Sequence, residues 1–319
     1  MTLFISEREV RELFPMPRAL EQVEASFRAQ HDGKGLNRPR QRIFLPGTSL
    51  HYMAAALPEE HWVGIKIYTV TSASFRFVVL LFDAASGELL AFIEADYLGR
   101  IRTGAASGVA TKYLARADAS RVAVIGTGRQ ARTQLEAVAL VRKIGAVRIY
   151  SRDHQRRQDF CREMGERLNL EVDPTESAEA AARFGEIVVA ATTSPHPVIR
   201  GEWLQPGTHV NAIGANMANR REIDDVTLKR AGLITIDSLE QAKEEAGDLI
   251  LGFPGSGRDW DDVVELHEVV GGNRRRTNDE EITVFKSCGM ALWDVAAAGY
   301  IYRQALAAGR GRSLEPRKG

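Results

Sequence analysis

The stretch from Arg121 to Ala131 constrains the fold of this 319-residue chain more than any other feature. An apolar run, Val122–Ile125, leads directly into the pattern Gly126-x-Gly128-x-x-Ala131, and apolar residues then continue at helical spacing. A strand, a tight glycine turn and a helix in this order form the dinucleotide-binding unit of a Rossmann domain. The sequence therefore predicts a nucleotide site at this turn.

Each small residue of the pattern has its own task in such a unit. Gly126 allows the tight turn, Gly128 lets the backbone approach a pyrophosphate, and Ala131 lets the helix pack closely on the strand. The free N–H groups at the start of the helix favour the phosphate charge. We predict that the cofactor contacts six consecutive residues: Gly126, Thr127, Gly128, Arg129, Gln130 and Ala131.

The order of the other predicted elements indicates an α/β fold with two domains. From Arg121 onward, strands and helices alternate, which is typical of a doubly wound parallel sheet. Before it, strand-like runs follow one another without helices between them, which predicts an antiparallel or mixed sheet in an α+β domain. A long helix is predicted over Tyr97–Ala115 and another over Met290–Leu306. We expect residues 117–297 to form the NAD(P)-binding Rossmann domain, and residues 1–116 together with 298–319 to form the substrate-binding domain.

Composition excludes several other classes of protein. Lys and Arg together number 42 and so do Asp and Glu, so no net charge favours nucleic acid or a membrane surface. No apolar run is long enough for a membrane helix, and the N-terminus lacks the pattern of a signal peptide. The only cysteines, Cys161 and Cys288, are far apart, and no His/Cys cluster has metal-ligand spacing. We expect a cytoplasmic protein without a bound metal.

Five motifs, in order and at compatible spacing, make the chain resemble the ornithine cyclodeaminase/mu-crystallin family. They are Gly64-Ile-Lys66-Ile-Tyr68, Ile101-Arg-Thr-Gly-Ala-Ala-Ser107, the Gly126–Ala131 loop, Asn211-Ala-Ile-Gly-Ala-Asn216 followed by Arg221-Glu-Ile-Asp224, and Val284-Phe-Lys-Ser-Cys-Gly289. The resemblance implies a nicotinamide-dependent enzyme and a homodimer whose sheet-rich domain is also the dimerisation domain. It leaves the reaction open among cyclodeaminases, alanine dehydrogenases and ketimine or imino acid reductases.

The resemblance also implies which residues bind the substrate. The family holds the substrate carboxylate with basic residues that match Arg42, Lys66 and Arg102, although Arg40 is a competing match for Arg42. Guanidinium groups suit this task because they bind a planar carboxylate through two parallel hydrogen bonds. Burial and neighbouring guanidinium groups should lower the pKa of Lys66, which could then donate a proton to an imine nitrogen. We therefore expect Lys66 and Arg102 to be the catalytic residues.

Asn216 separates the possible reactions. Cyclodeaminases of the family carry an aspartate at this position, whereas the Asn216 amide cannot accept a proton at neutral pH. Asp224 could in principle substitute, but its position before a predicted helix favours a helix cap. We therefore expect Asn216 to contact the substrate of a reductase or dehydrogenase rather than of a cyclodeaminase.

Residues after the predicted strands complete the expected cofactor site. NAD-specific Rossmann domains usually place an acid at the end of the second strand, whereas this chain has Ser151 and Arg152 there, with Asp153 one position later. An arginine suits a 2′-phosphate, so NADP(H) is slightly favoured over NAD(H). Further cofactor contacts are expected where other strands end and at one family position: Thr192, Gly214, Ala215 and Ser287.

These expectations give NAD(P)H-dependent reduction of a 2-imino acid to the L-amino acid as the leading function. His51 and Arg76 in the first domain favour a small or acidic side chain, as in the reduction of iminosuccinate to aspartate. Small 2-imino acids and cyclic ketimines are further candidates. The alternatives are a cyclodeaminase for ornithine or lysine, amino acid oxidation of the alanine dehydrogenase type, and a crystallin-like protein that binds cofactor without catalysis.

Overall fold

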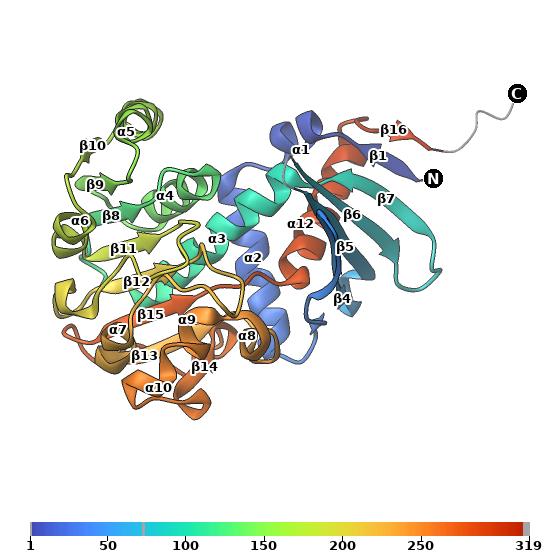
Figure 1. The fold of residues 1–319 in the computed structure, drawn as a ribbon. Helices are drawn as coiled ribbons and strands as arrows, with labels where there is room; N and C mark the ends of the chain where they lie inside the picture. The colour runs from blue at the N-terminus through green and yellow to red at the C-terminus, as the bar shows by residue number, and fades with distance from the viewer. Residues whose placement is uncertain (1, 72–73, 315–319) are drawn as a thin grey trace, which may run out of the picture. The chain divides into compact units, whose positions relative to one another are not determined.

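The computed structural model describes residues 2–71 and 74–314, and in it the chain forms two compact units. Unit 1 comprises residues 1–102 and 290–319, and unit 2 comprises residues 103–289. The last residues of the expected substrate-binding domain, 315–319, lie outside the described part of the chain. Figure 1 shows the elements of both units.

Unit 1 is built around a mixed sheet. Its strands are β1 (Leu3–Ile5), β2 (Leu36–Asn37), β3 (Gln41–Leu45), β4 (Thr48–Leu57), β5 (Trp62–Thr71), β6 (Phe75–Asp83), β7 (Leu89–Glu94) and β16 (Arg312–Ser313). They pair in the order β16-β1-β7-β6-β5-β4-β2, and β3 also pairs with β4. Only the β1–β7 pair is parallel among the described strand pairs of this sheet. The helix-free succession of strands thus gives the predicted mixed sheet, with the short strands β1, β2 and β16 as unpredicted additions.

The helices of unit 1 cover the inner face of this sheet. They are α1 (Glu7–Leu13), α2 (Met16–His31), the first part of α3 (Asp96–Leu114) and α12 (Ala291–Ala307), with a 3-10 turn at Pro58–Glu60. Helix α12 packs on β4, β5 and β6, and α2 packs on α12. The contact is close because small residues of α12 meet the strands, for example Gly299 against the Trp62 ring. Trp293 of α12 and Phe27 of α2 stack edge to face at 5.4 Å in the core.

The strand register assigns each side chain of β4, β5 and β6 to one face of the sheet. Met53, Lys66 and Val79 lie opposite one another and are buried, so they point to the inner face. Residues between them point to the outer face and are half-buried or exposed. The outer face is largely apolar: Leu50, Tyr52, Ala54, Val63, Ile65, Ile67, Val78, Leu80, Phe82 and Phe92.

Unit 2 is a doubly wound parallel sheet, as predicted. Its strands are β8 (Arg121–Ile125), β9 (Ala146–Tyr150), β10 (Glu171–Pro174), β11 (Ile187–Ala190), β12 (His209–Ala212), β13 (Ala231–Ile236), β14 (Val263–Glu265) and β15 (Ile282–Lys286). All described pairs are parallel, in the order β10-β9-β8-β11-β12-β15-β13-β14. The carboxyl ends of these strands therefore share one edge of the sheet.

Helices cover both faces of the parallel sheet (Figure 1). On one face, α4 (Arg129–Val141) and α5 (His154–Leu168) bury side chains with Val122 and Val124 of β8. On the other face, Ala123 and Ile125 of the same strand belong to a second core. The helices that contribute to this second core are α6 (Ala178–Phe184), α7 (Asp225–Arg230), α8 (Leu239–Glu245), α9 (Gly247–Ile250) and α10 (Phe253–Ser256). The remaining elements of the unit are α11 (Leu266–Val270), which follows β14, and the 3-10 turns Gly201–Trp203 and Trp260–Asp262.

The division into units differs from the predicted domain boundaries at 116/117 and 297/298. Helix α3 is continuous, but the chain passes from unit 1 to unit 2 between Arg102 and Thr103, in its middle. The second part of α3 packs in unit 2, where Gln134 of α4 donates a hydrogen bond to the Thr103 carbonyl oxygen at 3.2 Å. Helix α12 lies entirely in unit 1. Helical periodicity does not reveal which neighbours a helix packs on, so the sequence could not show where the two units divide.

In the part of the chain that the structure describes, every helix is too short or too polar to cross a lipid bilayer.

Candidate active site

In unit 1, the predicted catalytic lysine forms part of a buried ion cluster. Lys66 Nζ lies 2.7 Å from Asp294 Oδ1, and Arg102 Nε lies 3.0 Å from the same oxygen. Strand β5, helix α3 and helix α12 each supply one of these three side chains, and all three are buried. Gly99, one turn before Arg102, faces the lysine, since a Cβ there would lie 3.1 Å from Nζ. The structure thus brings together Lys66 and Arg102, two of the three residues predicted to bind the substrate carboxylate.

The cluster lowers the pKa of Lys66 to about 8. Burial is the largest cause because it disfavours the charged ammonium, and the Arg102 guanidinium acts in the same direction. The Asp294 carboxylate opposes both and keeps the pKa from falling further. A lysine with this pKa is protonated at neutral pH and can release its proton readily, which are the properties of a general acid.

Arg40 and Arg42 both lie on the inner side of the unit 1 sheet, but each has different neighbours on β4. Arg42 pairs with His51 in the β3–β4 register. Arg40 is buried, and its Nη2 lies 4.0 Å from Sδ of Met53, the residue opposite Lys66. Arg40 also contributes to lowering the Lys66 pKa. Arg40 therefore lies beside the pair Met53 and Lys66, whereas Arg42 lies beside the next inner-facing pair, His51 and Tyr68.

The inner-facing residues next to Met53, Lys66 and Val79 on the three strands are aromatic. His51, Tyr68 and Phe77 lie opposite one another on β4, β5 and β6. The His51 and Tyr68 rings stack with centroids 4.6 Å apart, and Tyr68 and Phe77 stack at 4.8 Å. The Lys66 ammonium lies 5.5 Å from the centre of the Phe77 ring. A flat aromatic surface thus borders the cationic cluster.

The two residues that suggested an acidic substrate side chain do not supply positive charge to the inner face. Arg76 is exposed and lies opposite Thr69, so its side chain belongs to the outer face of the sheet. His51 is buried, and burial together with Arg42 and Arg40 lowers its pKa to about 4. The imidazole is therefore neutral at pH 7. Its Nε2 pairs with Ser49 Oγ at 2.7 Å.

In unit 2, the glycine loop follows β8 and begins α4. Gly126 has a φ of 111°, and a Cβ there would collide with the Ala191 carbonyl oxygen, so the chain itself requires glycine. Gly128 is the N-cap residue of α4, and a Cβ there would meet no atom of the protein within 4 Å. The space in front of Gly128 suits the pyrophosphate of a dinucleotide. Ala131 is fully buried against the sheet, as predicted.

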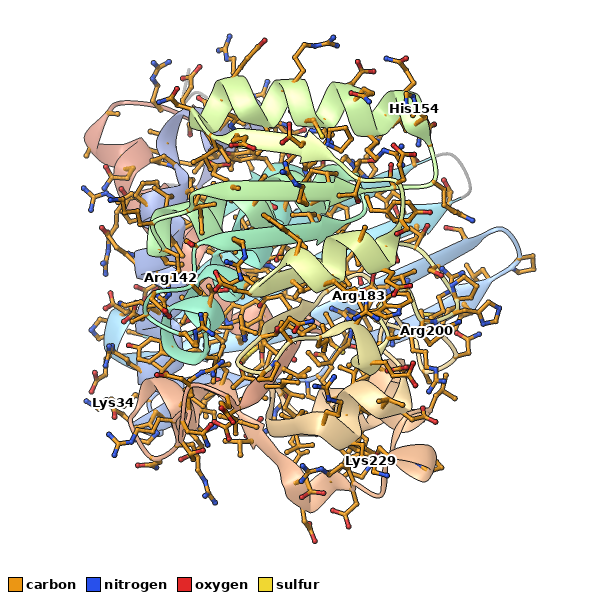
Figure 2. The ribbon with its side chains drawn as sticks, turned by 90° about the vertical axis from the view of Figure 1, so that its left-hand side faces the viewer. Lys34, Arg142, His154, Arg183, Arg200 and Lys229 are labelled. Atoms are coloured by element: carbon orange, nitrogen blue, oxygen red, sulfur yellow. The ribbon has the colours of Figure 1, made fainter. Side chains whose placement is uncertain are left out.

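Ser151, Arg152 and Asp153 link β9 to α5, whose first residue, His154, is labelled in Figure 2. The Asp153 carboxylate caps α5 by accepting a hydrogen bond from Arg156 N at 3.0 Å, and it also lies 3.4 Å from Arg156 Nε. Arg152 is exposed. The Asp153 carboxylate is thus hydrogen-bonded to the first turn of α5, whereas the Arg152 side chain is exposed at the surface of the loop.

Thr192 and Gly214 are held by a buried glutamate, Glu222. Its Oε1 accepts from Thr192 N at 2.6 Å and from Thr192 Oγ1 at 2.7 Å, and Oε2 accepts from Gly214 N. A Cβ at Gly214 would collide with the Thr192 carbonyl oxygen, so glycine is needed for the two loops to touch. Burial, reinforced by the nearby Asp248 carboxylate, raises the pKa of Glu222 above its usual range. The glutamate fixes the loops after β11 and β12 to each other.

Lys286, at the end of β15, completes this buried network. Its Nζ lies 2.9 Å from Asp248 Oδ2 and donates to the carbonyl oxygen of Ala215. Asp248 Oδ1 in turn accepts from the backbone N–H groups of Glu222 and Ile223. Burial is the largest single influence on the pKa of Lys286 and lowers it, but the charges of Asp248, Cys288 and Glu222, with the Asp248 hydrogen bond, together outweigh burial, and the pKa is raised. The ammonium is therefore charged, and it ties the loop of Ala215 to the sheet.

The remaining predicted residues of unit 2 have clear local surroundings. Ser287 is buried, its hydroxyl donates to Asp237 Oδ2 at 2.9 Å, and its backbone N–H donates to the Ala212 carbonyl oxygen at 3.2 Å. Asn216 is exposed in the loop after β12. Asp224 caps α7 by accepting from Thr227 N at 2.9 Å, as predicted. These loops all follow carboxyl ends of the parallel strands.

Three functional candidates were missed in the sequence: Asp294, Glu222 and Lys286. Asp294 had a signal, because it is the sole charged residue in the apolar run Ala291–Ile301, and a charge in such a run needs a buried partner. Glu222 and Lys286 stood inside the motifs that carry the family resemblance. Their role depends on Asp248, whose position no local pattern indicated.

Known proteins resemble this chain over most of its length. The sequence model of the ornithine cyclodeaminase/mu-crystallin family matches residues 1–309. A Δ(1)-pyrroline-2-carboxylate reductase of Bacillus cereus is 37% identical over 262 residues, which cover 79% of this chain and 80% of that protein. The structure of the Thermococcus litoralis Δ(1)-pyrroline-2-carboxylate reductase with NADH and L-proline is 34% identical and has a TM-score of 0.93, covering 98% of this chain and all of that one. An archaeal alanine dehydrogenase dimer with bound NAD is likewise 34% identical with a TM-score of 0.93, covering 98% and 99% of the two chains.

Proposed function

The chain belongs to the ornithine cyclodeaminase/mu-crystallin family and is an NAD(P)-dependent oxidoreductase, and from this premise we propose that it reduces a 2-imino acid to the L-amino acid. The observation that carries the proposal is the buried Lys66–Arg102–Asp294 cluster, with a lysine whose pKa is about 8. Such a cluster combines a carboxylate-binding guanidinium with a proton donor.

In the proposed reaction, Arg102 binds the substrate carboxylate together with Arg40 or Arg42. Reduced nicotinamide, when bound at the glycine loop, supplies a hydride to the imine carbon. Lys66 donates the Nζ proton to the imine nitrogen, so that the C=N bond becomes a C–N bond and the lysine is left neutral until it takes a proton from solvent. Atoms and charge balance without a metal or a general base. An asparagine at position 216 is compatible with this reaction, whereas it lacks the carboxylate expected of a cyclodeaminase.

We further propose that the substrate side chain is small or cyclic rather than acidic. The aromatic row of His51, Tyr68 and Phe77 beside the lysine offers a flat apolar wall. Because Arg76 faces away and His51 is neutral at pH 7, the case for iminosuccinate is weaker than the sequence suggested. The relatives named above, which include Δ(1)-pyrroline-2-carboxylate reductases, support a cyclic ketimine as the first candidate.

A spectrophotometric panel tests the proposed function. The purified protein is given NADPH or NADH with preformed Δ(1)-pyrroline-2-carboxylate, or with ammonia plus pyruvate, glyoxylate, oxaloacetate or 2-oxoglutarate. We expect oxidation of the reduced cofactor with the cyclic ketimine and slower or no oxidation with the dicarboxylic imine. No oxidation with any substrate, together with ammonia release from ornithine or lysine under catalytic NAD⁺, would instead make the protein a cyclodeaminase.

We propose NADP(H) as the preferred cofactor because Arg152 is exposed while the neighbouring acid, Asp153, caps α5. Replacing Arg152 by alanine should raise the KM for NADPH about tenfold or more and leave the KM for NADH nearly unchanged, since a charge-assisted hydrogen bond is worth about 1.5–3 kcal/mol. Arg162→Ala, an exposed arginine further along α5, is the matched control. Equal effects on both cofactors, or a wild-type preference for NADH, would contradict the proposal.

We propose that the outer face of the unit 1 sheet is covered by a second copy of the chain. A contiguous apolar surface of this kind is typical of protein interfaces, and the archaeal relative described above forms a dimer. The wild-type protein should have twice the mass of the 35.2 kDa chain in light scattering, and Leu80→Glu on β6 should give monomers or aggregates. Leu140→Glu, at an exposed leucine of α4, should remain dimeric. A monomeric wild type at micromolar concentration would refute the dimer.

A further inference from the structure

The most unusual charged residue of unit 1 is Asp294. It is fully buried in α12, where its neighbours in the sequence are apolar from Ala291 to Ile301. A buried carboxylate is costly unless hydrogen bonds and opposite charges compensate for the loss of water. The cost indicates that the residue serves a purpose beyond packing, because an apolar side chain would stabilise such a helix more simply.

The purpose follows from the two cations that share a single oxygen. Oδ1 of Asp294 accepts from Lys66 Nζ at 2.7 Å and from Arg102 Nε at 3.0 Å. One atom of α12 thus sets the separation between a side chain of β5 and a side chain of α3. A guanidinium is rigid and planar, so a bond at Nε also fixes the direction of its terminal nitrogens. The Trp293 ring, 5.4 Å from the Arg102 guanidinium carbon, holds the same group from α12.

We propose that Asp294 is the positioning residue of the reaction, which holds Lys66 protonated and at a fixed distance from the carboxylate-binding Arg102. This inference rests on the proposed function, in which Lys66 donates a proton and Arg102 binds the carboxylate. Asp294 itself neither touches the substrate nor gives up a proton.

The groups around Lys66 explain why the charge of Asp294 matters. Arg102 from α3 and Arg40 from the segment before β3 disfavour the ammonium form, and so does burial. Phe77 and Val79 from β6, Met53 from β4 and Gly99 from α3 also lie beside the lysine and carry no charge. Among the described residues that influence the lysine, Asp294 alone favours the protonated form. Without this carboxylate, the pKa of Lys66 falls below about 8 and the lysine loses its proton nearer neutrality.

The test is the pH dependence of kcat/KM for imine reduction by Asp294→Asn, an isosteric change that removes only the charge. Activity requires protonated Lys66, so the wild-type rate should be full below about pH 8 and fall above it. In Asp294→Asn, the alkaline limb should move to lower pH by about one to three units, the range expected for loss of an adjacent opposite charge. Glu60→Gln, which removes an exposed carboxylate of unit 1 paired with Arg303, should leave the limb in place.

A second variant, Asp294→Glu, separates charge from placement. It keeps the carboxylate but moves it by one methylene, so the alkaline limb should stay while kcat/KM falls by up to about 10²-fold, as expected for a small misplacement. It also keeps the proposal testable if Asp294→Asn does not fold. An unmoved limb in Asp294→Asn, or wild-type kcat/KM in Asp294→Glu, would reduce Asp294 to a structural counter-ion. Failure of the proposed function has a different signature, namely a wild-type protein that reduces no imine with either cofactor.

Discussion

Lys66→Met should lower kcat for imine reduction by about 10²–10⁴-fold, the usual contribution of a general acid. The methionine keeps much of the length of the lysine and fills the same buried space between β5, α3 and α12. It removes the one side chain in the described cluster that can release a proton near neutral pH, because arginine does not deprotonate in proteins. Single-turnover measurements of cofactor oxidation would report the chemical step directly.

The matched variant is Lys66→Arg. It preserves the positive charge beside Asp294 but cannot donate its proton, so it should be nearly as inactive as Lys66→Met. Binding of NADPH, followed by its fluorescence, should stay within a few-fold of wild type in both variants, because the glycine loop belongs to unit 2. If Lys66→Met raised KM alone and left the pH profile of kcat intact, the lysine would be a carboxylate ligand and not the acid.

Lys286→Met should destabilise the protein by about 3–5 kcal/mol, the cost of breaking a buried ion pair by removing one partner. The change leaves Asp248 and Glu222 as buried carboxylates without the ammonium that balances them. The midpoint of thermal unfolding should fall by roughly 10 °C. Affinity for NADPH should also weaken, because the loops of Thr192 and Ala215 lose their common support.

The control for this prediction is Lys229→Met, an exposed lysine of α7 that Figure 2 labels. It should shift the unfolding midpoint little, since surface charges contribute little to stability. The double variant Lys286→Met with Asp248→Asn should recover part of the lost stability, because the unpaired charge is removed along with its partner. A single variant as stable as wild type would show that the pair is not important for folding.

Several elements of unit 2 could be predicted because their signals are local. The glycine pattern, the apolar run of β8 and the spacing of Leu135 and Val138 in α4 all lie within a few turns of chain. The short strands β1, β2, β10, β14 and β16 were missed, since two to four residues give too little periodicity to recognise. Each of them pairs with a longer strand.

The candidate site was predictable in its cations and loops but not in its counter-charges. Motifs identified Lys66, Arg102 and the residues that follow the parallel strands. The faces of the mixed sheet were not predictable: only the register shows that Arg76 lies on the outer face while His51 stacks on Tyr68. Shifting the register by one residue would exchange the faces, so the composition of a strand cannot assign them.

The sequence by itself determined the family, the order of the longer elements, the glycine loop after β8 and the cations of the candidate site, because each rests on residues close together in the chain. The tertiary structure alone decided that Asp294, 228 positions after Lys66, would hold that lysine and Arg102 on one oxygen. It also decided that α3 would be divided between two units. The physical reason is the same in both cases: burial and pKa depend on which distant elements pack together, and no local pattern records that packing.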